Sequence, residues 1–282
     1  MIEETKKAYP VTELCSVMEV PRSSYYYWKK QSQSVDVERE SKRQLVKKIH
    51  ADVEMAYGSR RMSTELSNRG VSVGRHQARS LMREAQVEAV MPKPKHKYPQ
   101  TEIESAVAPN LLKREFSVDT PNTVWTGDIT YIRTLQGWLY LAIVLDLYSR
   151  RVVGWAVSET PDTALTKRAL TVALGHRERG EGLLFHSDQG CQYTSKAFQT
   201  YLIENNIKQS MSRRGNCWDN APTERFFCSL KAERIRNKIY SSSSLATSDT
   251  LDYIHRFYNH ARIHSACGNM PPAIFEKLNQ AA

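Results

Sequence analysis

Three acidic residues stand where the surrounding sequence predicts ordered, buried structure, and their types suit one kind of chemistry. Asp128 lies within the apolar stretch VWTGDITYIR, Asp188 follows LLFHS, and Glu224 lies between Pro222 and two phenylalanines. Acids seldom interrupt buried segments unless they are paired or coordinate a cation. If the three converge, they provide an all-oxygen ligand set that suits Mg²⁺ or Mn²⁺. Two such ions about 4 Å apart would stabilise both the attacking and the leaving oxygen of a phosphodiester.

Glu224 also has a purely structural interpretation. Asn220 can cap a helix, Pro222 suits its first turn, and Glu224 would then complement the positive end of the helix dipole. The helix would bury a stripe at spacings of three and four, made of Phe226, Phe227 and Leu230. The local sequence leaves both interpretations open.

Other polar residues in special positions have weaker claims to catalysis. Asp146 ends an expected strand at a turn, and Asp219 is expected to help start the helix at Asn220. Asp162 and Asp249 resemble ordinary helix starts. His260 and His264 have the spacing of zinc-binding helices without the glutamate of a HExxH pattern, so zinc is the weaker interpretation. His186 is expected to support Asp188 or contact nucleic acid. The chain has no phosphate-binding loop, so an ATP-driven mechanism lacks support.

The elements that would position the three acids follow from the hydrophobic pattern of the body, which begins near Val124. Apolar stretches predict five strands, at residues 124–133, 137–149, 150–160, 183–188 and 207–212. Helical periodicity predicts helices at residues 162–177, at residues 195–206 and from Asn220 onward. This order predicts an α/β fold with a mixed five-stranded sheet. Asp188 then lies at the carboxyl end of a strand, where open α/β sheets gather their sites.

The first hundred residues are basic and read as helices. They carry 19 Lys and Arg against 12 Asp and Glu, in a chain of 282 residues with a net charge of +10. This charge favours a nucleic-acid partner, with a solubilising surface as the alternative. VTELCSVMEV, Pro21 and RSSYYYWKK predict one helix pair; residues 38–53, SRRMSTELSNRG and GRHQARSLMREAQ predict further helices. In the last of these, Leu81 and Met82 are expected to face a core. Another face carries three arginines at four-residue spacing, which suits docking on double-stranded DNA: Arg75, Arg79 and Arg83.

The composition limits the class of protein and the cellular compartment to be expected. The longest apolar run, WLYLAIVL, is far too short to span a bilayer, and the polar start MIEETKKAYP offers no signal-peptide core. Five scattered cysteines without a CxxC pair fit reduced thiols. We therefore expect a cytoplasmic protein that makes no contact with a membrane. MPKPKHKYPQ predicts a basic linker. The expected divisions are a helix-turn-helix region at 1–90, a linker at 91–121, an α/β core at 122–240 and a helical tail at 241–282 with a helix around YIHRFYNHARIH.

Several motifs together resemble a known family. HSDQGCQYTS, SRRGNCWDNAPTERFFCSLKAE and YNHARIHSACG followed by a Pro-Pro pair are similar to the OrfB-type transposases of the "IS three" group of bacterial insertion sequences. YGSRRMSTELSNRGVSVGRHQARSLMREA is similar to the integrase-associated helix-turn-helix of that family. Asp128 in WTGDITYI matches the first acid of the family, and 35 residues separate Asp188 from Glu224, as in the family. The resemblance covers essentially the whole chain.

The resemblance implies a DDE transposase whose catalytic core has the retroviral-integrase-like, RNase H fold. Asp128, Asp188 and Glu224 would be its catalytic residues and would hold two Mg²⁺ or Mn²⁺ ions for cleavage of insertion-sequence ends and for strand transfer. Lys231, seven residues after Glu224, is expected to hold DNA phosphate, with Arg225 and Arg234 as weaker candidates.

The family also implies partners. These are double-stranded DNA of the terminal inverted repeats and of the target in the bacterial nucleoid, a homo-oligomer on that DNA, and a partner or fused segment from an upstream reading frame. Two other interpretations stay open: a nuclease with an RNase H core that cuts without joining, and a DNA-binding regulator. A regulator would leave three acids in costly positions without a role.

Overall fold

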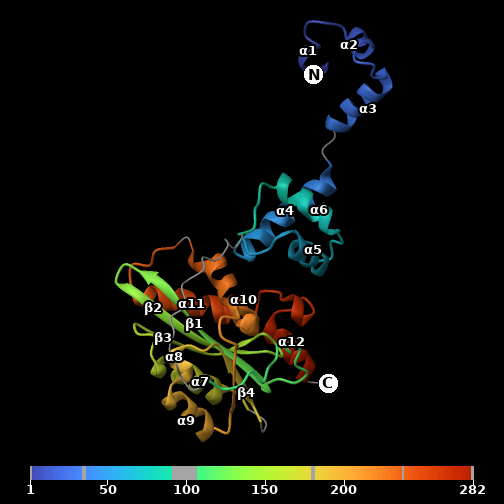
Figure 1. Ribbon diagram of the computed structural model, residues 1–282. Coiled ribbons are helices and arrows are strands. Elements are labelled where there is room, and N and C mark those ends of the chain that lie inside the picture. Colours follow the sequence, from blue (N-terminus) through green and yellow to red (C-terminus); the bar gives the residue numbers. More distant parts are fainter. Residues whose placement is uncertain (1, 34–35, 91–106, 179–181, 237, 281–282) are drawn as a thin grey trace.

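The computed structural model describes residues 2–33, 36–90, 107–178, 182–236 and 238–280 (Figure 1). Its central feature is a five-stranded sheet with the strand order β3-β2-β1-β4-β5. The strands are β1 (Val124–Thr134), β2 (Gly137–Asp146), β3 (Val152–Ser158), β4 (Leu184–Ser187) and β5 (Lys208–Met211). The first three pair antiparallel, whereas β4 and β5 run parallel to β1. The prediction of a mixed five-stranded sheet is confirmed.

Helices cover both faces of the sheet, which explains why β2 is a continuous apolar run rather than an alternating one. On one face lie α7 (Thr163–His176), α8 (Cys191–Thr194) and α9 (Lys196–Glu204), which bury one hydrophobic cluster with the sheet (Figure 1). α7 begins where the sequence predicts, because the carboxylate of Asp162 accepts a hydrogen bond from the N–H of Leu165 at 2.8 Å. Gly154 of β3 allows α7 to pack closely: a Cβ there would lie 2.3 Å from the carbonyl oxygen of Ala169.

The other face is covered by the C-terminal part of the chain. It consists of η1 (Cys217–Asn220), α10 (Ala221–Leu230), η2 (Lys231–Ile235), α11 (Ser243–Asp252), η3 (Tyr253–Tyr258), η4 (Ser265–Cys267) and α12 (Pro272–Gln280). The helix predicted around YIHRFYNHARIH is present over its first half and ends at Tyr258. The prediction that Asp249 starts a helix is wrong. Ser242 caps α11 instead, while Asp249 lies in its last turn and accepts from the hydroxyl of Tyr240.

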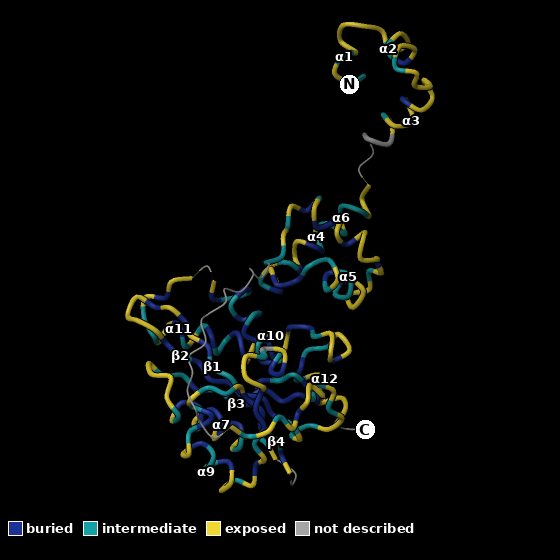
Figure 2. Tube along the Cα trace, viewed as in Figure 1, coloured by how far each residue is buried: buried dark blue, intermediate teal, exposed yellow. Residues whose placement is uncertain are grey.

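The N-terminal helices form two groups. α4 (Val37–Asp52), α5 (Ser59–Asn68) and α6 (Arg75–Glu84) pack around one core, in which Leu81 and Met82 are buried as predicted. α1 (Ile2–Thr5), α2 (Val11–Val17) and α3 (Arg22–Gln33) lie apart from that core in Figure 1. Figure 2 shows the difference in burial: buried residues lie in the interior of the α4–α6 unit and around the sheet, whereas α1–α3 is mostly exposed.

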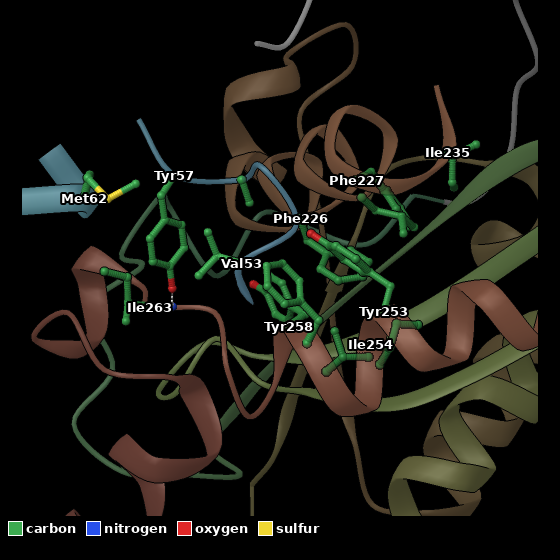
Figure 3. Close-up of a cluster of buried hydrophobic side chains, with 14 of the residues drawn as sticks. Val53, Tyr57, Met62, Phe226, Phe227, Ile235, Tyr253, Ile254, Tyr258 and Ile263 are labelled. Atoms are coloured by element: carbon green, nitrogen blue, oxygen red, sulfur yellow. Dashed lines mark hydrogen bonds between the residues drawn. The ribbon is translucent and has the colours of Figure 1, made fainter. Parts of the chain in front are cut away.

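The α4–α6 unit is packed against the C-terminal part of the chain. The hydroxyl of Tyr57 accepts from the N–H of Ile263 at 3.0 Å and donates to the carbonyl of Ala261 at 3.3 Å. Figure 3 shows Val53 and Tyr57 beside Ile263, Phe226 and Tyr258 in one continuous cluster. The hydrophobic cores of the helical unit and of this sheet face are therefore one core.

Part of the stretch predicted as a linker contacts the sheet. The N–H groups of Leu111 and Leu112 donate to the hydroxyl of Ser210 on β5, and Leu112 is buried. Residues 91–106 of that stretch lie outside the described residues, and the predicted divisions of the chain remain predictions. Within the described ranges, no helix has the length and apolar composition that crossing a membrane requires.

Candidate active site

The first two acids meet through the parallel pairing of β1 and β4. Thr126 pairs with His186, so the register, continued by two residues, sets Asp128 opposite Asp188. Neighbouring strands lie about 4.8 Å apart, and residues two apart on a strand share a face. Asp128 is half-buried, and its Oδ1 accepts from the N–H of Ile129 at 2.7 Å. The two acids therefore lie at the same end of the sheet, where β4 ends.

Asp188 begins the turn that leads from β4 to α8. Its Oδ1 accepts from the N–H of Gly190 at 3.0 Å. The side chain keeps contact with solvent, but the protein packed around it desolvates the carboxylate, and the negative charge of Glu224 adds to this effect. Both raise the pKa of Asp188, so a positive charge placed beside this carboxylate would be stabilised.

Glu224 is placed by the first turn of α10. The hydroxyl of Thr223 lies 2.6 Å from that of Thr126 on β1, which holds this turn against the sheet. Pro222 occupies the first turn, as predicted. Asn220 stands at the cap position, but its side chain makes no capping bond; Nδ2 donates to the carbonyl of Gly127 at 3.3 Å. The asparagine therefore ties the helix start to the residue before Asp128.

The predicted buried stripe of α10 is confirmed, and it anchors the helix in the hydrophobic core. Phe226, Phe227 and Leu230 are all buried. The ring of Phe226 packs edge-to-face on Tyr258 with centroids 4.7 Å apart, within the cluster of Figure 3. Because this stripe fixes the rotation of the helix about its axis, it also fixes the direction in which Glu224 projects.

Asp219 has a different role from the one predicted. It is fully buried, and its carboxylate accepts from the backbone N–H and the guanidinium of Arg213, from Arg114 and from Asn110 rather than from the start of α10. The hydrogen bonds from Arg213, followed by that from Arg114, lower the pKa of Asp219 far below its ordinary value. Asp219 thus locks the loop before α10 to residues 110–114, which sequence patterns alone could not indicate.

Electrostatic contacts place the three acids at one end of the sheet. Glu224 acts on Asp188, and the buried hydroxyl of Tyr193 on α8 has a strongly raised pKa because of burial and because Asp128 and Asp188 oppose its ionisation. In the parts of the chain that the structure describes, no group of three or more His, Cys, Asp or Glu side chains has the geometry to hold a metal ion together. The three acids lie at the same end of the sheet, but their carboxylate oxygens do not form a closed set of metal ligands among the described residues.

The histidines and Asp146 serve the scaffold. His186 is buried between the hydroxyls of Ser210 and Ser212, at 2.8 and 3.1 Å, and burial lowers its pKa to about 4. It supports the strand that leads to Asp188 and is not accessible to DNA. Asp146 accepts from the N–H of Tyr148 and has the structural turn role that was predicted. His260 and His264 both bond to backbone groups.

The basic side chains that are predicted to contact DNA differ in their surroundings. Arg225 is exposed, and Lys231 is half-buried with Nζ 4.3 Å from the centre of the Tyr131 ring. Arg234 is instead held by Glu54 and Asp252 at 2.9 and 2.5 Å, so this weaker candidate serves the packing of the α4–α6 unit. The three arginines of α6 are all exposed, as their spacing predicts: Arg75, Arg79 and Arg83.

The sequence patterns missed several residues near the acids. Thr126 and Thr223 bond to each other across 97 positions of the chain, and nothing in their local sequence signals this. Tyr131 and Trp138 were read only as strand residues, yet both are large, exposed aromatics that contact each other, and Tyr131 also contacts Lys231.

Comparisons with known proteins agree with this architecture. Two family models described as "Integrase core domain" match residues 118–217 and 205–272, and one described as "HTH-like domain" matches residues 37–95. The chain is 38% identical over 274 residues to the "Insertion element IS600 uncharacterized 31 kDa protein" of Shigella sonnei, covering 95% of this chain and 100% of that protein. It is 34% identical over 286 residues to "Transposase InsF for insertion sequence IS3A" of Escherichia coli K12, covering 99% and 98%.

Solved structures that align with the chain include the HTLV-2 integrase catalytic core domain in complex with magnesium. That alignment has 18% sequence identity and a TM-score of 0.41, and it covers 55% of this chain and 97% of that one. The integrase core of the family models and the mixed sheet with helices on both faces give the fold class: an RNase H-like core preceded by a helical region with a helix-turn-helix-like unit.

Proposed function

The chain belongs to the transposases of the IS3 family, and on this premise we propose that Asp128, Asp188 and Glu224 are the catalytic residues with which it cleaves and joins DNA. The observation that carries the proposal is their meeting at one end of the sheet, from β1, from the end of β4 and from the first turn of α10. DNA is the substrate class, and the enzyme class is a DDE polynucleotidyl transferase.

The three side chains fit a divalent metal by their chemistry. They offer only carboxylate oxygens, which suit Mg²⁺ or Mn²⁺. Glu224 makes the negative charge of Asp188 unfavourable, and a cation between them would remove that repulsion. We propose that the site holds two such ions.

Two bound ions would stabilise the attacking and leaving oxygens of a phosphodiester, first with water and then with a freed 3′-hydroxyl as the nucleophile. The protein supplies positioning. β1 fixes Asp128, the Gly190 N–H orients Asp188, and the Thr126–Thr223 bond with the buried stripe of α10 fixes Glu224. Arg225 and Lys231, on or just after α10, would hold DNA phosphates near the reacting strand.

Joining two element ends to one target needs more than one active site, so we propose that the working form is a homo-oligomer on DNA in the bacterial nucleoid. The exposed arginines of α6 would bind the terminal repeats. A segment from an upstream reading frame is a further proposed partner. Sedimentation of the chain with and without a duplex that carries two element ends tests the oligomer: a monomer on that DNA would contradict it.

The catalytic proposal is tested with a duplex that carries the terminal repeat, a target duplex and Mg²⁺. Asp128→Asn, Asp188→Asn and Glu224→Gln should each reduce cleavage and joining to background while binding of the duplex survives. Glu204→Gln, which changes an exposed acid of α9, is the matched control and should leave both steps unchanged. Ordinary turnover in any of the three variants would sink the assignment. Cutting without joining by the wild-type chain would identify a nuclease, and an intact duplex would identify a regulator.

A further inference from the structure

An exposed pair of aromatic side chains lies at the end of the sheet beyond the acids. Tyr131 of β1 is 41% exposed and Trp138 of β2 is 49% exposed. Their ring centroids are 5.2 Å apart with the planes at 89°, an edge-to-face contact. Tyr131 pairs with Tyr140 and Arg133 pairs with Trp138, so the two rings are diagonal neighbours on one face of the hairpin. Together they present a continuous aromatic surface to solvent.

Lys231 connects this surface to the catalytic helix. Its Nζ lies 4.3 Å from the centre of the Tyr131 ring, a cation–π contact that holds the ring in place. Lys231 follows Glu224 by seven residues, or about 10 Å along the helix, and shares a side of the helix with it. Tyr131 follows Asp128 by three residues, or about 10 Å along β1, so these two side chains leave opposite faces of the strand. The contact with Lys231 is what brings the ring near the end of the sheet that carries the acids.

This distance can be compared with the spacing of nucleotides along a DNA strand. A distance of about 10 Å corresponds to roughly three base steps of a strand at 3.4 Å per step. If a phosphodiester is cut beside Glu224, a base about three steps along the strand, past Lys231, reaches the aromatic pair. The inference rests on the proposed function for the position of the DNA.

The charges around the pair favour DNA over a protein partner. The hairpin from Ile129 to Leu145 contains no Asp or Glu, and its charged residue, Arg133, is basic and exposed. Arg225 and Lys231 add positive charge from the side of α10. Aromatic rings edged by basic side chains are the usual surface for bases outside a duplex, because every base has a face that can stack. Paired bases already stack on their neighbours, so the gain is reserved for unpaired ones.

We propose that Tyr131 and Trp138, with Lys231 holding the ring of Tyr131, form a stacking site for an unpaired nucleobase within about three nucleotides of the cut phosphodiester. The site distinguishes distorted or frayed DNA at the reaction point from intact duplex. It adds selectivity to phosphate contacts, which by themselves do not distinguish one base from another.

The test compares binding of two probes to the full chain without divalent metal: a blunt duplex, and the same duplex with a single-stranded arm that carries 2-aminopurine. Tyr131→Ala and Trp138→Ala should weaken binding of the forked probe by about 5- to 150-fold, the range for loss of one stacked base, and leave the blunt probe unchanged. They should also abolish the quenching of 2-aminopurine. Tyr131→Phe and Trp138→Phe keep a ring and should retain most of the effect.

Leu135→Ala is the matched control, because Leu135 is an exposed apolar residue of the same hairpin and has no ring. It should bind both probes as the wild type does, and the circular dichroism of all variants should match. Unchanged forked-probe binding in both alanine variants, or equal losses with the blunt probe, would overturn the proposal. A change of oligomeric state without a change in forked-probe affinity would identify a protein contact instead.

The assay needs no cleavage, so its result is independent of the catalytic assignment. Asp188→Asn should keep the preference for the forked probe. If that preference is found but the acid variants remain active, the proposed catalytic residues are wrong and the stacking site stands. If the acid variants are inactive and the preference for the forked probe is absent, the catalytic residues are correct and the stacking site is wrong.

Discussion

The hydroxyl oxygen of Thr126 on β1 lies 2.6 Å from that of Thr223 on α10, and both side chains are fully buried. Thr126 stands two residues before Asp128, and Thr223 directly precedes Glu224. One buried hydrogen bond therefore joins the two elements that carry the first and third acids. Its loss should affect both the stability of the fold and the position of Glu224.

Replacing one partner of this pair should cost more than replacing both. Thr126→Val or Thr223→Val leaves a buried hydroxyl without a partner, which should reduce the free energy of unfolding by about 1–3 kcal/mol. The double variant replaces both hydroxyls by groups of the same shape and should recover most of that loss. Urea unfolding of the four proteins measures the coupling. Losses that simply add in the double variant would show that the hydroxyls do not interact.

Gly154→Ala should destabilise the contact between β3 and α7. The new Cβ would lie 2.3 Å from the carbonyl oxygen of Ala169 and 2.7 Å from the Cβ of Ala173, so the helix must shift. Overpacking of this kind costs about 1–3 kcal/mol. Gly175→Ala is the control: it lies in α7 with nothing within 4 Å, and alanine favours a helix by about 1 kcal/mol. Thermal unfolding should move in opposite directions for the two variants.

Tyr57→Phe should loosen the attachment of the α4–α6 unit. Without the hydroxyl, the buried N–H of Ile263 loses its acceptor at 3.0 Å, at a cost of about 1–3 kcal/mol. Hydrogen exchange at Ile263 should become faster, while the core of α6 around Leu81 keeps its protection. Tyr27→Phe, on the exposed face of α3, should change neither. Unaltered exchange at Ile263 would mean that this bond does not hold the unit in place.

The arginines of α6 should account for part of the salt dependence of DNA binding. Each of Arg75, Arg79 and Arg83 that contacts a phosphate should, when changed to Ala, reduce the slope of log K against log salt concentration by about 0.9. Lys48→Ala removes an exposed charge from α4 and is the comparison. Fluorescence anisotropy at several salt concentrations gives the slopes. Equal slopes for the wild type and the arginine variants would argue against α6 as the DNA-reading helix.

His264 should make stability depend on pH. Burial, together with the positive charges of Arg262 and Arg150, lowers its pKa from 6.5 to about 4. The unfolded chain therefore binds more protons than the folded one between these values, so stability is fully present above pH 6.5 and is lost as the pH falls toward 4.

The variant His264→Asn isolates that contribution. Asparagine can still accept from the N–H of Ala266, as Nδ1 does at 3.3 Å, but it does not titrate. The urea midpoint of the wild type should therefore fall more steeply than that of the variant between pH 6.5 and pH 4. Parallel pH profiles would show that His264 does not contribute.

Local patterns in the sequence were enough to predict which segments form strands and helices and where each acid lies within its own segment. Strand and helix patterns are local, since they reflect which face of a short segment is buried; this is why the five strands, the α10 stripe and the Asp162 cap could be predicted. For the same reason, local patterns could predict that Glu224 lies in the first turn of a helix and that Asp188 directly follows a strand.

Which side chains contact each other became known only from the folded chain. Asp219 and Asn220 both have the sequence context of a helix start, yet their side chains bond to Arg213 and to Gly127. Asp249 looked like a helix start until its bond to Tyr240 showed otherwise. The partners of Thr126 and Tyr57 lie 97 and 206 positions away. Such pairs depend on strand register and on how helices pack over the sheet, and a local pattern carries no information about either.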